Sequence, residues 1–198
     1  MATQSERRAT TRAAILKTAR HLFGDRGFEN TTIDDIAIAA RVAKGAIYHH
    51  FKTKEALFEA VFDAVSADLA GDIERAAKAE KDILAAMAAG TQLYFAACAK
   101  KPIGQIILRD GPAVLGWDRW RKIDMEHFGG QIPHALAAAM EAGLVARQPV
   151  EPLARLLLGA VTEAAVACAG RSDIAKAGAE YGRAFKSLLE MLRVKPAG

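Results

Sequence analysis

Apolar residues recur along most of this chain at the three- and four-residue spacing of helix faces. The clearest case is the stretch 32–54, TIDDIAIAARVAKGAIYHHFKTK, which holds two short helix patterns and the start of a third. Their inward faces are Ile33, Ile36, Ala37 and Ala40 in the first helix, and Val42, Ile47 and Phe51 in the second. A few residues separate the two patterns, so we expect two short helices joined by a tight turn.

The remaining face of the second helix is polar and carries cationic, small and aromatic side chains. Two short helices of this kind describe a helix-turn-helix, whose second helix enters the major groove of DNA. The start of the second helix is unusual, because Ala43 has no side-chain oxygen with which to cap it.

Helix patterns continue on both sides of this pair. A first helix is expected to end near residues 24–27, after an arm without structure up to about Thr10. Thr53 is expected to cap a fourth helix, and a fifth is expected from Asp82 to about Lys100. Later helices are predicted over 102–110, from Pro112 to about 128, over 134–143, over 151–170 and over 173–193, with breaks at Gly111 and at Gly129–Gly130.

Composition supports an all-α fold and limits the class of protein. Hydrophobic residues make up 52% of the 198 positions, alanine is abundant, and hairpin signals are absent. The formal net charge is +4, with most of the excess in residues 1–60. Cys98 and Cys168 are expected to be reduced core cysteines, with a redox switch as the alternative. No uninterrupted apolar run of eighteen residues occurs, and the N-terminus lacks a secretory signal, so we expect a cytoplasmic protein.

The motif AIAARVAKGAIYHHFKTKEAL resembles the end of the DNA-binding domain in the TetR (tetracycline-repressor-like) family of bacterial transcription regulators. The match extends from about Arg12 to Phe62 and is densest at Gly45, Tyr48, His50, Phe51, Lys54 and Leu57. It departs at Arg41 and Ala43, where the family usually has glycine and serine. Because glycine tolerates positive φ, the resemblance implies that Arg41 either adopts a left-handed conformation or forms a different turn. The resemblance implies an N-terminal arm and three-helix DNA-binding domain over residues 1–53, and a helical ligand-binding and dimerisation domain over residues 54–198.

By the same resemblance, the DNA-binding residues divide into two groups. Thr32, Tyr48 and Lys54 are expected at phosphates, with Arg41 as a further candidate and His50 as a possible backbone contact. Lys44, Gly45, Ala46 and His49 are expected against base edges, where a lysine can donate to guanine and an alanine can meet a thymine methyl. The alternative for Tyr48 and His50 is packing between helices.

The resemblance also implies a small-molecule pocket and a twofold interface in the C-terminal domain. Pocket candidates are Gln92, Tyr94, Ile106, Arg109, Trp117, Trp120, His127 and Phe128. The last two helices are expected to pair with those of a second copy through Leu156, Ala160, Ala164, Tyr181, Phe185, Leu188 and Leu192. The alternative is that these apolar faces form a core within one chain.

The sequence thus predicts a homodimeric, ligand-responsive regulator, most simply a repressor that a small molecule releases from a palindromic double-stranded operator. A transcriptional activator, or a small-molecule-binding protein or enzyme retaining the helix-turn-helix, are the alternatives. No catalytic residue, cofactor or metal site is expected. The nearest cluster, Asp124, Glu126, His127 and His134, has its two histidines seven residues apart rather than on adjacent turns, which differs from the spacing of a shared metal.

Overall fold

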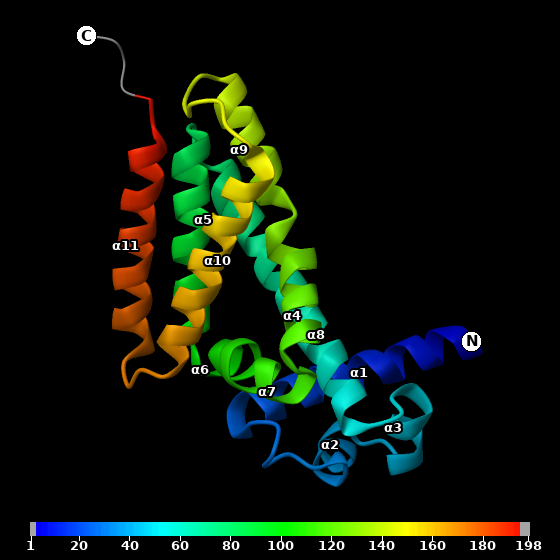
Figure 1. Cartoon of the computed structure of the whole chain (residues 1–198). Coiled ribbons are helices and arrows are strands. Elements are labelled where there is room, and N and C mark those ends of the chain that lie inside the picture. The colour runs from blue at the N-terminus through cyan, green and yellow to red at the C-terminus, as the bar shows by residue number, and fades with distance from the viewer. Residues whose placement is uncertain (1–2, 195–198) are drawn as a thin grey trace. The chain divides into compact units, whose positions relative to one another are not determined.

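The computed structural model describes residues 3–194, and they form an all-α protein (Figure 1). Within that range the only strand-like pairing is an isolated antiparallel bridge between Val145 and Arg193. The helices in chain order are α1 (Gln4–Arg26), α2 (Ile33–Ala40), α3 (Lys44–His50), α4 (Lys54–Lys78), α5 (Ile83–Cys98), α6 (Lys101–Gly104), the π-helical η1 (Gln105–Asp110), α7 (Gly111–Leu115), α8 (Trp117–Asp124), the π-helical η2 (Met125–Gly129), α9 (Gln131–Glu141), α10 (Val150–Ala169) and α11 (Ile174–Leu192).

The chain forms two compact units. The first contains the described residues up to 65 together with 101–120, and the second contains 66–100 and 121–194. Helices α4 and α8 continue without a break from one unit into the other. The boundary expected between residues 53 and 54 remains a prediction about domains, and it coincides with the start of α4.

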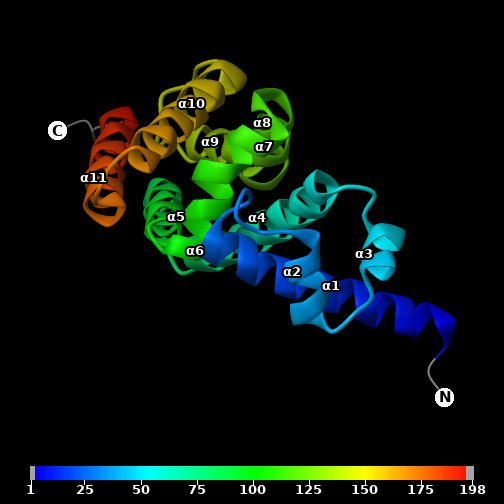
Figure 2. The ribbon, with the colours of Figure 1, turned by 90° about the horizontal axis from the view of Figure 1, so that it is seen from below.

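In the first unit, α2 and α3 both lie against α1 (Figure 2). Their packing buries Ile15, Ile36 and Ile47 completely, and the rings of Phe23, Phe28 and Phe58 contact one another with centroids 5.3–5.7 Å apart. The apolar periodicity therefore identified the buried faces of these helices correctly. Burial of large apolar side chains is the main favourable term holding such short helices in place.

The expected unstructured arm is wrong over the described residues, because α1 begins at Gln4. Thr3 caps it: the Thr3 hydroxyl accepts from the amide of Glu6, and the Glu6 carboxylate accepts from the amide of Thr3. This reciprocal capping box satisfies two amides that would otherwise lack partners at the helix start. The Thr-x-x-Glu pattern was present in the sequence. Met1 and Ala2, the rest of the expected arm, lie outside the described residues.

Residues 101–120 pack on α1 and α4 within the first unit. The positions of Gly24 and Gly111 allow this packing, because a Cβ on Gly24 would lie 2.9 Å from Pro102 and one on Gly111 would lie 2.7 Å from Phe62. The break expected at Gly111 is absent, since η1 continues directly into α7. The break occurs instead at Gly116, whose φ of +74° separates α7 from α8.

In the second unit, α5 and α11 lie side by side, with α9 and α10 packed nearby (Figure 1). Gly178 and Gly182 of α11 allow close approach, because added Cβ atoms would lie 3.1 Å from Phe95 and 3.3 Å from Gln92. One end of the unit is closed by Arg193, which forms an ion pair of 2.7 Å with Asp82, the N-cap of α5. The guanidinium lowers the pKa of Asp82 to about 2.

Candidate DNA-binding surface and ligand cavity

The turn between α2 and α3 is built with Arg41 in the left-handed region, at φ 56° and ψ 45°. Its backbone amide donates to the carbonyl of Ile38, and the amide of Val42 donates to Ala37, so the turn closes as a helix C-cap normally does. Of the two alternatives for this turn, the structure adopts the left-handed one. As expected from its side chain, Ala43 makes no capping hydrogen bond to α3. By contrast, Thr32 caps α2 through the amide of Asp35.

Most of the outward face of α3 is exposed, although Ala46 and His50 are partly buried. Lys44, Gly45, Tyr48 and His49 are exposed, and a Cβ added to Gly45 would meet no atom within 4 Å. The ammonium of Lys44 lies 2.9 Å from the carboxylate of Asp34, and this hydrogen bond raises the pKa of the lysine. To bind a base edge, Lys44 would therefore replace its exposed ion pair with Asp34 by a contact to the base.

Lys54 has partners within the chain. Its ammonium donates to the backbone carbonyls of Phe28, at 2.9 Å, and Thr31, at 3.1 Å, and lies 3.9 Å from the centroid of the Phe28 ring. The side chain thus ties the start of α4 to the connection between α1 and α2. A phosphate contact by Lys54 stays a prediction, and it would be an additional role to the one that these contacts give it.

A groove between the start of α1 and α3 adds basic residues that the sequence alone did not single out. Its lining includes Arg7, Arg8 and Thr11 of α1 with Ala46, His49 and His50 of α3. Burial lowers the pKa of His50, and the charges of His49, Arg8 and Arg12 lower it further, so this imidazole is mainly neutral at neutral pH. The signal that could have identified Arg7 and Arg8 is the capping box, because it extends α1 beside α3.

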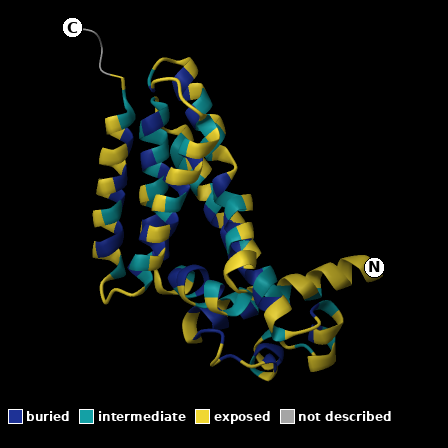
Figure 3. Cartoon of the chain, in the orientation of Figure 1, coloured by how far each residue is buried: buried dark blue, intermediate teal, exposed yellow. Residues whose placement is uncertain are grey.

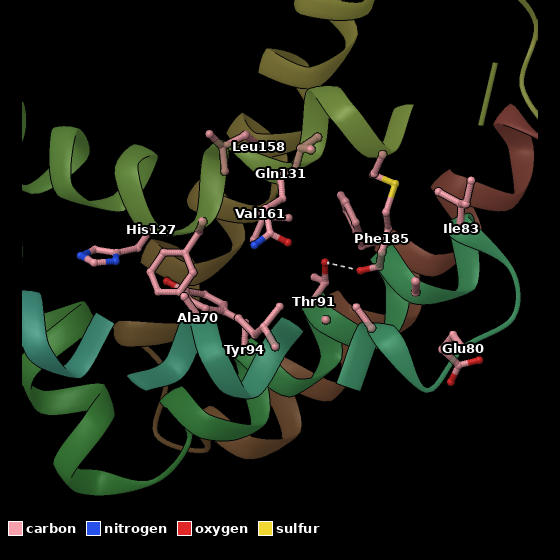
Figure 4. A pocket seen from close by; sticks show the side chains of 18 of the residues that line it. Ala70, Glu80, Ile83, Thr91, Tyr94, His127, Gln131, Leu158, Val161 and Phe185 are labelled. Carbon is pink, nitrogen blue, oxygen red and sulfur yellow. Dashed lines mark hydrogen bonds between the residues drawn. The ribbon is translucent and has the colours of Figure 1, made fainter. Parts of the chain in front are cut away.

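The second unit contains a partly open cavity of about 410 Å³. Figure 4 shows side chains from α4, α5, η2, α9, α10 and α11 converging on it, with His127 toward one end and Glu80 toward the other. Most of the lining is apolar, including Ile73, Met87, Tyr94, Phe128, Leu158, Val161 and Phe185. A volume of this size and a largely apolar wall are typical of small-molecule sites.

Three of the eight residues expected in the pocket line this cavity: Tyr94, His127 and Phe128. The other five lie elsewhere. Ile106, Arg109, Trp117 and Trp120 belong to the first unit, where Trp120 is buried and donates to the carbonyl of Ile107. Gln92 is on α5 but lies beside Gly182 of α11. The amino-acid sequence does not show which face of α5, or which of the two units, each of these residues belongs to.

Asp124, which belongs to the acidic and histidine cluster of the sequence, is one of the polar residues that line the cavity. Its side chain is buried, with the residue 6% exposed. Burial raises the pKa of its carboxyl to about 6, although the charges of Arg121 and His127 act in the opposite direction. Burial also raises the pKa of Cys98 to about 12, so this thiol is protonated and unreactive at neutral pH, which argues against a redox switch there. No group of three metal-ligating side chains occurs within residues 3–194.

The expected interface residues divide between the interior and the surface of the second unit. Ala164 and Phe185 are buried within the chain, and Phe185 lines the cavity, so the expected assignment of these two to a partner contact is wrong. Leu156 and Leu188 are exposed, and so are Val166 and Met191, which were not among the expected interface residues. The seven-residue apolar pattern in α11 predicted an outward interface, but the face that contains Phe185 packs inside the unit, where α11 lies against α5.

Helix α10 is also long and apolar enough to cross a membrane by composition, but only 39% of its most apolar window is buried. Figure 3 shows exposed positions along the outer sides of α10 and α11. Part of the apolar surface on these helices is therefore uncovered within the chain, and a single such helix is weak support for a membrane.

Comparison with known proteins identifies both parts of the chain. Residues 15–61 match the family model "Bacterial regulatory proteins, tetR family", and residues 84–192 match "Tetracyclin repressor-like, C-terminal domain". The structure is similar to that of a TetR-family transcriptional regulator from Pectobacterium atrosepticum, with a TM-score of 0.86 and 30% identity, over 99% of this chain and 100% of the other.

Two curated relatives add to this comparison. The Transposon Tn10 TetC protein of Escherichia coli is 23% identical over 195 residues, which are 97% of each chain. The transcriptional repressor KstR2 of Mycolicibacterium smegmatis is 45% identical over 53 residues, which cover 27% of this chain and only 26% of that relative. The higher identity is thus confined to a short local match.

Proposed function

This chain belongs to the TetR family and is a DNA-binding transcription regulator, and from that premise we propose that it is a repressor released from a palindromic operator when a small molecule fills the cavity. The observation that carries the proposal is the pairing of an exposed, basic helix-turn-helix in one unit with a mostly apolar 410 Å³ cavity in the other. A regulator of this kind needs both a DNA surface and an effector site.

The DNA surface is proposed to consist of α3 with the first turns of α1. Lys44, Gly45, Ala46 and His49 meet base edges, and Tyr48 and His50 contact the backbone. Under the same proposal, phosphates are contacted by Thr32 at the start of α2, by Arg41 and by Lys54. Arg7 and Arg8 are added to this set because they line the groove beside α3. Cationic side chains at such positions supply the salt-dependent part of DNA affinity.

We propose further that two copies associate through the outer sides of α10 and α11. Exposed apolar residues gather there, with Leu156 72% and Met191 74% exposed. Small residues, Gly159 and Ala160, stand beside Leu156 and allow close helix approach. A twofold dimer would present two copies of α3 about 34–36 Å apart, or a multiple of that spacing, to successive major grooves. We place the dimer in the cytoplasm, where its DNA would be.

The proposal is tested by electrophoretic mobility shift with DNA from the protein's own gene neighbourhood. The logarithm of the association constant should fall linearly with the logarithm of the salt concentration. Arg8→Ala should reduce the magnitude of that slope by about one. Lys186→Ala, an exposed cation of α11 in the other unit, is the matched control and should leave the slope unchanged. No binding to any such DNA, or binding without salt dependence, would refute operator recognition. Transcription that falls in a deletion strain would identify an activator instead.

A further inference from the structure

One stretch of the cavity wall is not helical. The wall residues from α4, α5, α8, η2, α9, α10 and α11 all belong to helices, whereas Glu80, Lys81 and Asp82 lie in the connection between α4 and α5. Glu80 and Lys81 are exposed, so this connection borders the cavity on one side and solvent on the other. Short exposed connections open more readily than the helices that flank them, because fewer buried contacts hold them.

Asp82 anchors this connection in two ways. Its Oδ1 accepts a hydrogen bond of 3.0 Å from the amide of Ala85, which caps the start of α5. The same carboxylate accepts from two nitrogens of the Arg193 guanidinium, at 2.7 and 3.0 Å. A bidentate, charge-assisted pair of this kind is stronger and more directional than a single neutral hydrogen bond. Asp82 therefore joins the non-helical part of the wall to the end of α11.

Arg193 reaches Asp82 from a fixed position. Its Nε donates to the carboxylate of Glu190, at 2.8 Å, one turn earlier in the chain. Its backbone pairs with Val145 in the isolated antiparallel bridge. These contacts hold Arg193 whether or not Asp82 is bound to it, so the end of α11 can stay in place while the connection moves.

The pair between Arg193 and Asp82 can also break and form again. The two side chains are 30% and 33% exposed, so water can replace each partner when they separate. A fully buried pair could not separate in this way, because each charge would be left without a partner in a medium of low dielectric constant. The contact is thus strong enough to hold the connection and accessible enough to release it.

We propose that residues 79–82 form a lid over the cavity and that the pair between Arg193 and Asp82 is its latch. In the open state the pair is broken, and the lid moves aside to admit a bulky ligand through the partly open mouth. Arg193 is a positioning residue, because it does not line the cavity yet sets how often the lid opens. This inference rests on the proposed function, since the ligand that passes the lid is the effector.

Labelling of a thiol inside the cavity measures how often the lid opens. Thr91→Cys places that thiol on α5 within the cavity (Figure 4), and monobromobimane is a neutral thiol reagent with a fused ring system. Two latch variants are made in this background of the full chain. Arg193→Met removes the guanidinium, and Asp82→Asn removes the charge but keeps a side chain that caps helices about as well. Each should raise the labelling rate at position 91 at least fivefold at pH 7.5.

Two controls separate lid opening from a general loss of stability. The native thiol of Cys98 lies on the same helix and is buried, so it should react only when the unit unfolds, and its labelling rate should change less than twofold. Arg155→Met removes another arginine–carboxylate pair of this unit, with Glu151 of α10, and neither of these residues lines the cavity. It should leave the labelling rate at position 91 unchanged.

An unchanged rate at position 91 in both latch variants would overturn the lid. A rise at position 91 that is matched at Cys98 would also overturn it, because Arg193 would then hold the whole unit together. Operator binding measured on the same samples separates this proposal from the proposed function. A protein that binds operator DNA but shows no faster labelling keeps its proposed function without a latch, whereas faster labelling in a protein that binds no operator supports the latch alone.

Discussion

The carboxylate of Asp110 accepts a hydrogen bond of 2.8 Å from the backbone amide of Phe28, a residue 82 positions earlier in the chain. Its second oxygen accepts from the side-chain amide of Gln105, at 2.9 Å. The same connection that contains Phe28 is held from the other direction by Lys54. Through these contacts, residues 101–120 and the start of α4 are both tied to the loop that positions α2.

Asp110→Ala should lower the free energy of unfolding by about 1–3 kcal/mol, because it leaves the partly buried amide of Phe28 without an acceptor. Asp110→Asn keeps one oxygen acceptor and removes a carboxylate whose pKa is raised by burial, so it should cost less than half as much. Urea denaturation at pH 7.5 measures both variants. Equal losses for the two substitutions would contradict the role of the Phe28 hydrogen bond.

The turn before α3 should be improvable at two positions. Arg41→Gly relieves a left-handed conformation that costs a non-glycine residue about 1–2 kcal/mol, and Ala43→Ser supplies a cap that contributes about 1 kcal/mol. Each variant should therefore raise the denaturation midpoint, and their effects should be measured separately because the sites are close. Arg41→Lys keeps both the charge and the backbone strain, and it should leave stability unchanged.

Assembly should depend on the exposed apolar residues of α10 and α11. Leu156→Glu places a charge where we propose that a second copy packs, so sedimentation velocity should show a monomer or a much weaker dimer. Ile38→Glu is the control, because Ile38 is even more exposed, at 78%, but lies on α2. A Leu156→Glu variant that sediments as the unchanged dimer would move the interface to another surface.

The buried carboxyl of Asp124 should make stability depend on pH in a defined direction. Its pKa rises from 3.8 to about 6 on folding, so the folded state holds a proton that the unfolded state has lost between these values. Stability from this group is therefore present below about pH 4 and is lost as the pH rises to 6. The difference amounts to about 3 kcal/mol at 1.36 kcal/mol per pKa unit.

Asp124→Asn removes this dependence. The variant should become more stable than the natural protein across the interval from pH 4 to 6, and the gap should then stay constant to pH 8. Thermal denaturation at half-unit pH steps provides the comparison. A gap that does not change with pH would show that the carboxyl is ionised normally in the folded protein.

Sequence periodicity was sufficient for the helices and for most of their buried faces, because burial of one face is encoded at local spacing. It located Ile47 inside and Tyr48 outside without knowledge of the tertiary fold. The cavity was harder to predict, because its wall depends on which helices meet. Trp120 and Tyr94 both look like pocket aromatics in sequence, yet only Tyr94 lines the cavity.

Asp124 shows the same limit for charge. Acidic residues near a helix end are usually solvated, so nothing local distinguishes Asp124 from its neighbour Glu126, which is exposed. Helix packing alone determines that one faces the interior and the other faces water. For a related reason, the sequence does not distinguish the outer face of α11 from the face that packs on α5. Both sides of this helix carry apolar residues at helical spacing.

Gly45 has open space beside it, so the effect of a side chain at this position on folding can be measured apart from its effect on DNA binding. Since an added side chain there would touch nothing in the free protein, and glycine within a helix is less favourable than alanine by about 1 kcal/mol, substitution should make the protein more stable rather than less. Any loss of operator affinity in a library at position 45 would then report contact with DNA alone. Under the proposed base contact, DNA recognition favours a small residue at position 45 while stability favours a larger one, so new operator preferences can be selected there without a loss of folded protein.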